Sequence, residues 1–190
     1  MSSLFTIAFL VFMLMMGIHR VWETFLKYER EPGKIIQKWM LPTLTIIHFI
    51  IGIGIVIEYF VMRRTINYYV TVIGLFLYVL GLMGRNLSVR TLGKYHSIHI
   101  EVRAIHPLIK DGVYKYIRHP YYVSVVFEIL SISLIPNTYY MLIFSFLSYI
   151  PILMIKLYYE EKSMLEKFGV QYLSYKKDTG YFFPKIKRYL

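Results

Sequence analysis

The stretch YYVSVVFEILSISLIPNTYYMLIFSFLSYIPILMIKLY, residues 121–158, consists of two apolar runs on either side of Pro136 and Asn137. This dipeptide favours a tight turn, because proline cannot continue a helix and asparagine tolerates left-handed backbone conformations. A helix needs about 20 apolar residues to cross a bilayer. The stretch therefore predicts a helical hairpin in a membrane, with a short first span at 121–135 and a second at 138–158.

Three more apolar runs precede this hairpin, at 4–17, 40–62 and 67–83. Of the 190 residues, 57% are hydrophobic, whereas soluble domains contain about 45–50%. The first run lacks a basic head and a clear cleavage site, so it is interpreted as a retained span and not as a signal peptide. Together the five runs predict an all-α integral membrane protein with about five transmembrane helices.

The distribution of charge predicts an orientation for these spans. Most of the 22 lysines and arginines lie between the first two spans, between the third and fourth, and after the fifth. The positive-inside rule then places the N-terminus outside and the C-terminus in the cytoplasm. Residues 1–83 form three N-terminal spans, and residues 84–190 form a region whose cytoplasmic pieces, 84–120 and 159–190, flank the hairpin. A functional pocket that faces the cytoplasm is expected between them.

Composition also excludes several classes of function. The net charge of +11 is attributed to membrane topology and contact with lipid headgroups, and not to binding of nucleic acid. There is no cysteine, which rules out disulfides and thiolate catalysis. His96 and His99 lie three residues apart, but two histidines are weak evidence for a metal site, so none is predicted.

The segment GVYKYIRHPYY, residues 112–122, combines cations with tyrosines where the chain enters the fourth span. Pro120 suits the first turn of a helix, because its missing N–H has no partner there in any case. Arg118 and His119 would then lie at a helix N-terminus, whose free N–H groups and dipole favour an anion. The equal alternative is that both residues only anchor a helix end to lipid phosphates.

Other ionisable and aromatic residues are candidates for chemistry. Tyrosines at the mouth could stack on a base or face a cation, or form an ordinary interfacial belt. Glu160 and Glu161 could bind an amine, or belong to a solvated amphipathic helix. Glu128, within the fourth span, is a functional candidate because charge is costly at that depth. Alternatively it is neutral and hydrogen-bonded to His48 or a tyrosine.

HPLIKDGVYKYIRHPYYVS at 106–124, EEKSMLEKFGVQYLSYKK at 160–177 and FFP at 182–184 together resemble the isoprenylcysteine carboxyl methyltransferase family. This family is related to the phospholipid methyltransferases. The resemblance implies S-adenosylmethionine as methyl donor and a methyltransferase-like catalytic region at 84–190. It also implies that Glu160 and Glu161 lie near cofactor and acceptor. The cofactor pocket would be lined by His106, Leu108, Gly112, Tyr114, Arg118, His119 and Tyr122, and closed by Tyr172 and Tyr175.

The chain departs from the family pattern at two places. Ser124 stands where glycine is usual, and Ile155 and Lys156 stand where an arginine precedes the glutamate pair in eukaryotic members. Lysine cannot make the two parallel hydrogen bonds of an arginine guanidinium. This difference argues against a prenylcysteine carboxylate as the acceptor.

The predicted activity is methyl transfer to an oxygen, carboxylate or hydroxyl, of a lipophilic or lipidated acceptor. Glu160, Glu161 and Glu128 are the candidate catalytic groups, and the cell membrane is the expected location in a prokaryote. The alternatives are a phospholipid-type N-methyltransferase, a membrane sterol- or steroid-type reductase using NADPH, and a non-enzymatic membrane subunit.

Overall fold

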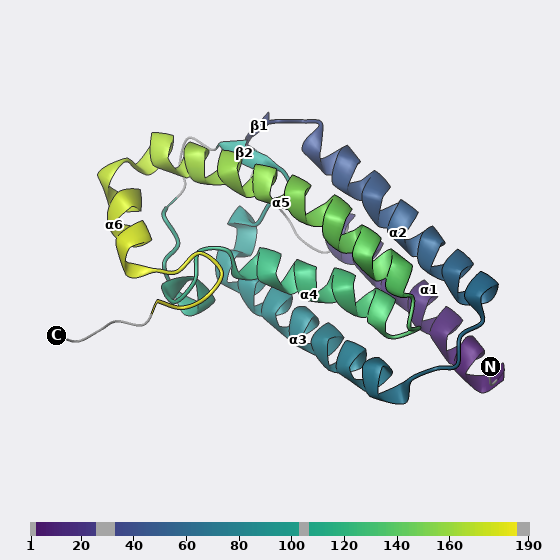
Figure 1. Ribbon diagram of the computed structural model, residues 1–190. Helices are drawn as coiled ribbons and strands as arrows, with labels where there is room; N and C mark the ends of the chain where they lie inside the picture. Colours follow the sequence, from purple (N-terminus) through teal and green to yellow (C-terminus); the bar gives the residue numbers. More distant parts are fainter. Residues whose placement is uncertain (1–2, 26–32, 103–106, 186–190) are drawn as a thin grey trace.

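The computed structural model describes residues 3–25, 33–102 and 107–185. Within these ranges the protein is a bundle of helices with one small pair of strands (Figure 1). The helices are α1 (Ser3–Phe25), α2 (Met40–Met62), α3 (Tyr68–Leu92), α4 (Pro120–Leu134), α5 (Tyr139–Phe168) and α6 (Val170–Asp178), with short 3-10 helices η1 (Gly93–Tyr95) and η2 (Gly112–Lys115). The strands β1 (Lys34–Ile36) and β2 (Ile100–Val102) pair antiparallel, an element that the hydrophobic pattern did not predict.

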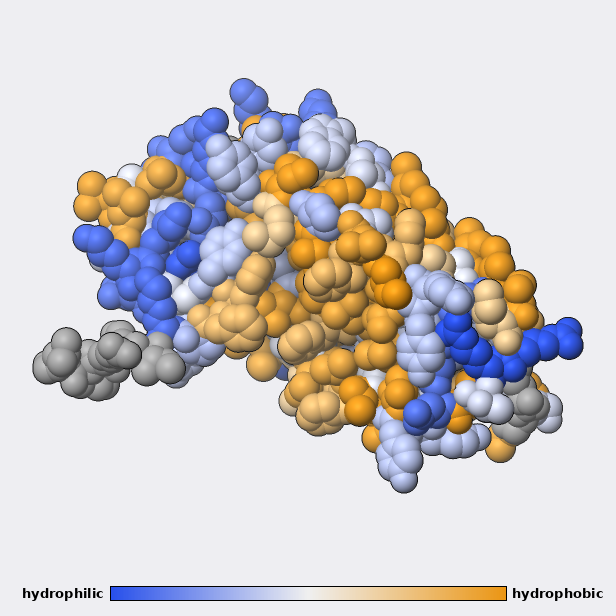
Figure 2. Space-filling view, in the orientation of Figure 1, coloured by the Kyte–Doolittle hydropathy of each residue, from blue (hydrophilic) through white to orange (hydrophobic). Residues whose placement is uncertain are grey.

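Four of the five predicted spans are long enough to cross a membrane. In the described part of the chain, α1, α2, α3 and α5 are sufficiently long and apolar, whereas α4 has only 15 residues. That number gives a helix of about 22 Å, shorter than the hydrocarbon core of about 30 Å. Figure 1 shows α4 lying between α3 and α5. A broad apolar band separates two polar ends of the molecule (Figure 2).

The helices continue beyond the apolar runs that predicted them. α3 extends nine residues past position 83, and α5 extends ten residues past position 158. Both extensions are richer in polar residues than the runs before them. They reach the same polar end of the bundle, where α6 and η2 also lie (Figure 1). The polar extensions of the spanning helices thus position the side chains of the candidate site.

The turn between α4 and α5 is held by polar contacts at the other end of the bundle. Asn137 adopts a left-handed conformation with φ of 62°, as the predicted tight turn requires. Its Oδ1 accepts a hydrogen bond of 2.7 Å from the Asn67 amide. Glu58 accepts from the amides of Tyr140 and Met141 at 3.1 and 2.8 Å, so it caps the start of α5. The hairpin is therefore tied to the connection between α2 and α3.

Small residues allow α3 and α4 to pack closely. A Cβ added to Gly81 would lie 2.7 Å from Glu128 Cγ and 2.9 Å from the Ser124 carbonyl oxygen. Ser124 itself faces Gly84 and donates to the Pro120 carbonyl oxygen at 2.9 Å. Close backbone approach through glycine is a common packing mode in membranes. The serine that departs from the family pattern is thus accommodated by a glycine on the facing helix.

Gly81→Ala is expected to destabilise the protein by about 1–3 kcal/mol, because an overpacked interface must shift its backbone. The measurement is the free energy of unfolding by SDS titration in mixed micelles. The matched control is Gly52→Ala in α2, where an added Cβ meets nothing within 4 Å; it should be neutral or slightly stabilising. Equal effects of the two substitutions would contradict the packing described here.

Candidate functional site

A cleft opens at the polar end of the bundle, where α3, α5, α6 and η2 meet. It encloses about 970 Å³ of space, part of which is open to solvent. Its wall combines aromatic rings, charged groups and aliphatic side chains. The lining residues are Leu92, Tyr95, Ser97, His99, Ile100, Glu101, Leu108, Ile109, Tyr114, Arg118, His119, Glu160, Ser163, Met164, Lys167, Phe168, Tyr172 and Tyr175.

Backbone pairing with a later part of the chain holds Arg118 and His119 at the cleft. The Arg118 amide donates to the Gly180 carbonyl oxygen at 2.9 Å, and the His119 amide donates to the Tyr181 carbonyl oxygen at 3.3 Å. His119 is the N-cap residue of α4, and Pro120 occupies the first turn as predicted. The backbone of Arg118 and His119 is therefore fixed at the start of α4 by the segment that follows α6.

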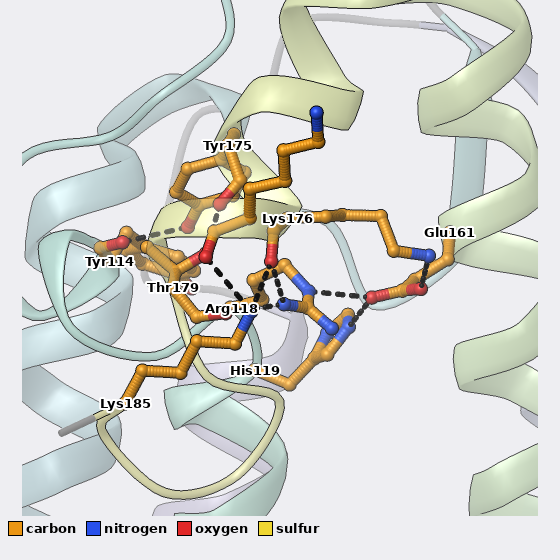
Figure 3. A network of polar contacts seen from close by, with 9 residues as sticks. Tyr114, Arg118, His119, Glu161, Tyr175, Lys176, Thr179 and Lys185 are labelled. Carbon is orange, nitrogen blue, oxygen red and sulfur yellow. Dashed lines mark hydrogen bonds and ion pairs between the residues drawn. The ribbon is translucent and has the colours of Figure 1, made fainter. Parts of the chain in front are cut away.

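Glu161 is surrounded by three cationic or basic side chains (Figure 3). Its Oε1 lies 2.8 Å from Arg118 Nε and 3.2 Å from His119 Nε2, and its Oε2 lies 2.7 Å from Lys176 Nζ. Arg118 Nη1 also donates to the Thr179 carbonyl oxygen at 2.7 Å. Charge-assisted bonds of this kind are the stronger ones. Glu161 therefore joins the start of α4 to α5 and α6.

Glu160 has a different environment from its neighbour. Its Oε2 accepts a hydrogen bond of 2.5 Å from the Tyr122 hydroxyl, and its side chain lines the cleft. The buried Lys156 lies one helical turn earlier, with Nζ 5.3 Å from the centre of the Tyr122 ring. Lys156 Nζ also donates to the Ile98 carbonyl oxygen at 2.8 Å. Of the two glutamates, Glu160 is thus the one that faces the cleft.

Tyr114, Tyr172 and Tyr175 of the cleft are neutral at physiological pH. Burial raises the pKa of Tyr175 to about 12, and burial also raises the pKa values of Tyr114 and Tyr172. The Tyr175 hydroxyl donates to the Tyr114 carbonyl oxygen at 2.7 Å, which joins α6 to η2. The rings therefore offer uncharged aromatic faces on which a base can stack or a cation can rest.

The structure brings most of the predicted site residues together. Leu108, Tyr114, Arg118, His119, Glu160, Tyr172 and Tyr175 line the cleft. Tyr122 and Glu161 contact lining residues, and Gly112 begins η2 with φ of 55°. His106 lies outside the described residues. Sequence reasoning missed Lys176 and Thr179, because their role depends on contacts with Arg118 and Glu161 that no local pattern reveals.

Glu128 lies apart from the cleft, in an ionic cluster of four residues that joins α1, α3 and α4. Glu128 Oε2 lies 2.7 Å from Arg20 Nη2, and its Oε1 lies 2.8 Å from Arg85 Nε. Arg85 also pairs with Glu23. Glu128 is therefore partnered by two arginines, and not by His48 or a tyrosine as the sequence alternative proposed. Its predicted catalytic role gains no support from its position.

The two histidines of the 96–99 segment lie on or near the cleft. His99 lines it, and the buried His96 has its ring centre 5.1 Å from that of Tyr121. Within residues 3–25, 33–102 and 107–185, no group of three or more His, Cys, Asp or Glu side chains is placed to hold a metal ion.

Comparison with known proteins identifies the family. The model of the isoprenylcysteine carboxyl methyltransferase family matches residues 72–166, which is half of the chain and includes α4 with most of α3 and α5. The chain belongs to the isoprenylcysteine carboxyl methyltransferase family. The resemblance expected from the residues around Arg118 and the glutamate pair is thereby confirmed.

Two relatives of known identity support this membership. The protein-S-isoprenylcysteine O-methyltransferase of Saccharomyces cerevisiae is 30% identical over 119 residues, which cover 61% of this chain and 49% of the yeast protein. The solved structure of a eukaryotic intramembrane Ras methyltransferase, also an isoprenylcysteine carboxyl methyltransferase, matches with a TM-score of 0.64 and 27% identity. That match covers 82% of this chain and 56% of the other. The chain therefore spans about half the length of these methyltransferases.

Proposed function

We propose that this protein is a multi-pass membrane methyltransferase that moves a methyl group from S-adenosylmethionine to an oxygen of a lipophilic acceptor. The observation that carries the proposal is the cleft at the polar end of the bundle, where Arg118, Glu160 and several tyrosines face one space. Family membership supports it, since both relatives are named as methyltransferases. The charge distribution supports a cytoplasmic opening of this cleft.

The charges of the cleft complement the polar ends of S-adenosylmethionine. Arg118 Nη2 makes no hydrogen bond to any residue that the structure describes, so it is available to the carboxylate of the cofactor. Glu160 Oε1 likewise has no partner among the described residues and suits the ammonium group. The neutral rings of Tyr114 and Tyr172 suit the adenine and the sulfonium. The residues present therefore fit this cofactor.

When bound, S-adenosylmethionine supplies an activated methyl group on a positively charged sulfur. The protein then has to align the acceptor with that group and to exclude water. A carboxylate acceptor is already ionised at neutral pH, whereas a phenolic hydroxyl with a pKa near 10 requires a base. His119 lines the cleft and is the candidate for that base, because Glu160 is assigned to the ammonium group. Glu161 is engaged by three side chains, which leaves it to a structural role.

The proposal is tested by calorimetric titration of S-adenosylhomocysteine into the detergent-purified protein, with NADPH titrated in parallel. Binding of S-adenosylhomocysteine in the micromolar range without binding of NADPH is the expected result. Methyl transfer from radiolabelled S-adenosylmethionine to a short prenylated cysteine, to the matching prenyl alcohol and to phosphatidylethanolamine then assigns the acceptor atom. Binding of NADPH alone would favour a reductase and overturn the proposal.

The two glutamates are expected to respond differently to the same substitution. Glu160→Gln should weaken binding of S-adenosylhomocysteine by about 10- to 100-fold, because one charged hydrogen bond contributes about 1.5–3 kcal/mol. Glu161→Gln should instead lower the free energy of unfolding, since Arg118 and Lys176 lose their shared anion. Calorimetry and SDS titration on both variants provide the comparison. A larger loss of ligand affinity in Glu161→Gln would reverse the assigned roles.

A further inference from the structure

The segment that follows α6, residues 179–185, forms a closed loop against the start of α4 (Figure 1). Lys185 Nζ donates to the Lys176 carbonyl oxygen at 2.9 Å, which fastens the end of the loop to the last turn of α6. Inside the loop, a Cβ on Gly180 would collide with the Phe183 carbonyl oxygen, so the close turn requires glycine. These contacts constrain the backbone of the whole loop.

Tyr181, inside this loop, places its ring against two residues of the cleft. The ring centre lies 5.2 Å from Arg118 Cζ, so that the guanidinium rests over the aromatic face. It also lies 4.7 Å from the centre of the His119 ring. Phe182 packs edge-on against the Tyr181 ring with 4.6 Å between centres. Tyr181 is not among the residues that line the cleft, so it contacts the site through Arg118 and His119.

The Arg118 guanidinium is thereby held both at its edges and on its face. Its Nε donates to Glu161 and its Nη1 donates to the Thr179 carbonyl oxygen, whereas the Tyr181 ring covers the face. A cation over an aromatic face is attracted by the quadrupole of the ring, and the planar guanidinium is well suited to such stacking. A side chain that is ordered before the ligand arrives loses less entropy on binding. The ring therefore favours the orientation in which Nη2 remains available.

We propose that Tyr181 is a positioning residue that orients Arg118 toward the carboxylate of the cofactor and so makes the cleft selective for ligands with a carboxylate. This inference rests on the proposed function, because that function pairs Arg118 with the cofactor carboxylate. Tyr181 lies outside the sequence motifs that pointed to the site. Its role follows from the loop that brings its ring to the start of α4.

The test combines two ligands with two side chains at position 181. S-adenosylhomocysteine is compared with its decarboxylated analogue, which keeps the nucleoside, the sulfur and the amine, by calorimetric titration of the detergent-purified protein. Tyr181→Leu is expected to weaken binding of S-adenosylhomocysteine by about 3- to 10-fold and to change binding of the analogue by less than about twofold. An equal loss for both ligands would overturn the proposal, because a cleft that has merely loosened affects both.

Three further variants separate the aromatic face from the fold of the loop. Tyr181→Phe keeps the ring and should keep the preference for the carboxylate. Tyr116→Leu is the matched control, because this tyrosine lies on the segment that faces the loop but its side chain is 59% exposed; it should also keep the preference. Trifluorophenylalanine at position 181 retains the shape of the ring but weakens its negative face, so it should lose the preference as leucine does.

The fluorinated variant decides the question if Tyr181→Leu does not fold, because its ring packs as phenylalanine does. A full preference for the carboxylate in this variant would show that the contact of the ring with the guanidinium contributes nothing, and it would overturn the proposal.

The titrations of the wild type judge the proposed function separately. Binding of neither ligand would refute that function, and the role of Tyr181 with it. Equal binding of both ligands would leave cofactor binding intact but would show that Arg118 does not read the carboxylate, which overturns the role of Tyr181. A wild-type preference for S-adenosylhomocysteine that persists unchanged in Tyr181→Leu would overturn the role of Tyr181 alone.

Discussion

Replacing Arg118 with alanine is expected to reduce the affinity for S-adenosylhomocysteine more than 100-fold. The guanidinium holds Glu161 through Nε and the Thr179 carbonyl oxygen through Nη1, and in the proposed complex its Nη2 binds the carboxylate of the ligand. Hydrogen bonds to charged groups contribute about 1.5–3 kcal/mol each. Arg118→Ala removes both the contact with the ligand and the contacts that anchor the segment after α6, so the affinity should fall by more than two orders of magnitude. Calorimetric titration of the detergent-purified variant measures the effect.

Two further variants separate charge from geometry at this position. Arg118→Lys keeps the charge but cannot donate from a planar fork, so it should recover only part of the affinity. Lys115→Ala removes a cation three residues away whose side chain is exposed, and it should leave affinity unchanged. Unaltered binding by Arg118→Ala would show that the ligand does not use this side of the cleft.

Arg85→Met is expected to lower the free energy of unfolding by about 3–5 kcal/mol, the usual consequence of removing one partner from a buried ion pair. Arg85 is 2% exposed and contacts both Glu23 and Glu128. Glu128 keeps Arg20 in the variant, but Glu23 is left as a buried carboxylate that has lost its arginine. SDS titration in mixed micelles gives the change in stability.

The ion-pair explanation has a specific test. Arg85→Met combined with Glu23→Gln should recover part of the lost stability, because the stranded charge is removed along with its partner. Arg90→Met, on the same helix at an exposed position, should change stability by less than about 0.5 kcal/mol. If the double variant is as unstable as the sum of the single ones, the charges are not coupled and packing of the arginine accounts for its effect.

The sequence predicts the spanning helices well because their signal is local. The run 40–62 coincides with α2, and the Pro136–Asn137 turn separates α4 from α5 as expected. The ends of α3 and α5 could not be predicted from hydropathy, since a helix that leaves the membrane continues with polar residues. The β1–β2 pair was missed because two three-residue strands far apart in the chain show no measurable periodicity.

The site illustrates the same limit at the level of single side chains. The sequence motif and the family resemblance predicted that Arg118, His119 and the glutamate pair belong to one site. These residues do lie at one cleft or beside it. Sequence could not tell that Glu160 faces the cleft while Glu161 is bound by three neighbours. The sequence also could not predict that Glu128 pairs with two arginines, because one of them, Arg20, is 108 residues away in the chain. Ion pairs between helices depend on the packed fold and produce no recognisable pattern in the local sequence.

Helix α5 gives the membrane itself a mechanical influence on the cleft. Its 30 residues form one helix of about 45 Å, whose first part lies in the apolar band and whose last turns carry Glu160 and Glu161. A helix adjusts to a thicker or thinner bilayer by changing its tilt. A change of tilt in the membrane-embedded part of α5 moves its last turns as well. We expect acyl-chain length to change the position of Glu160 at the cleft, so that lipid composition influences the site together with its amino acids.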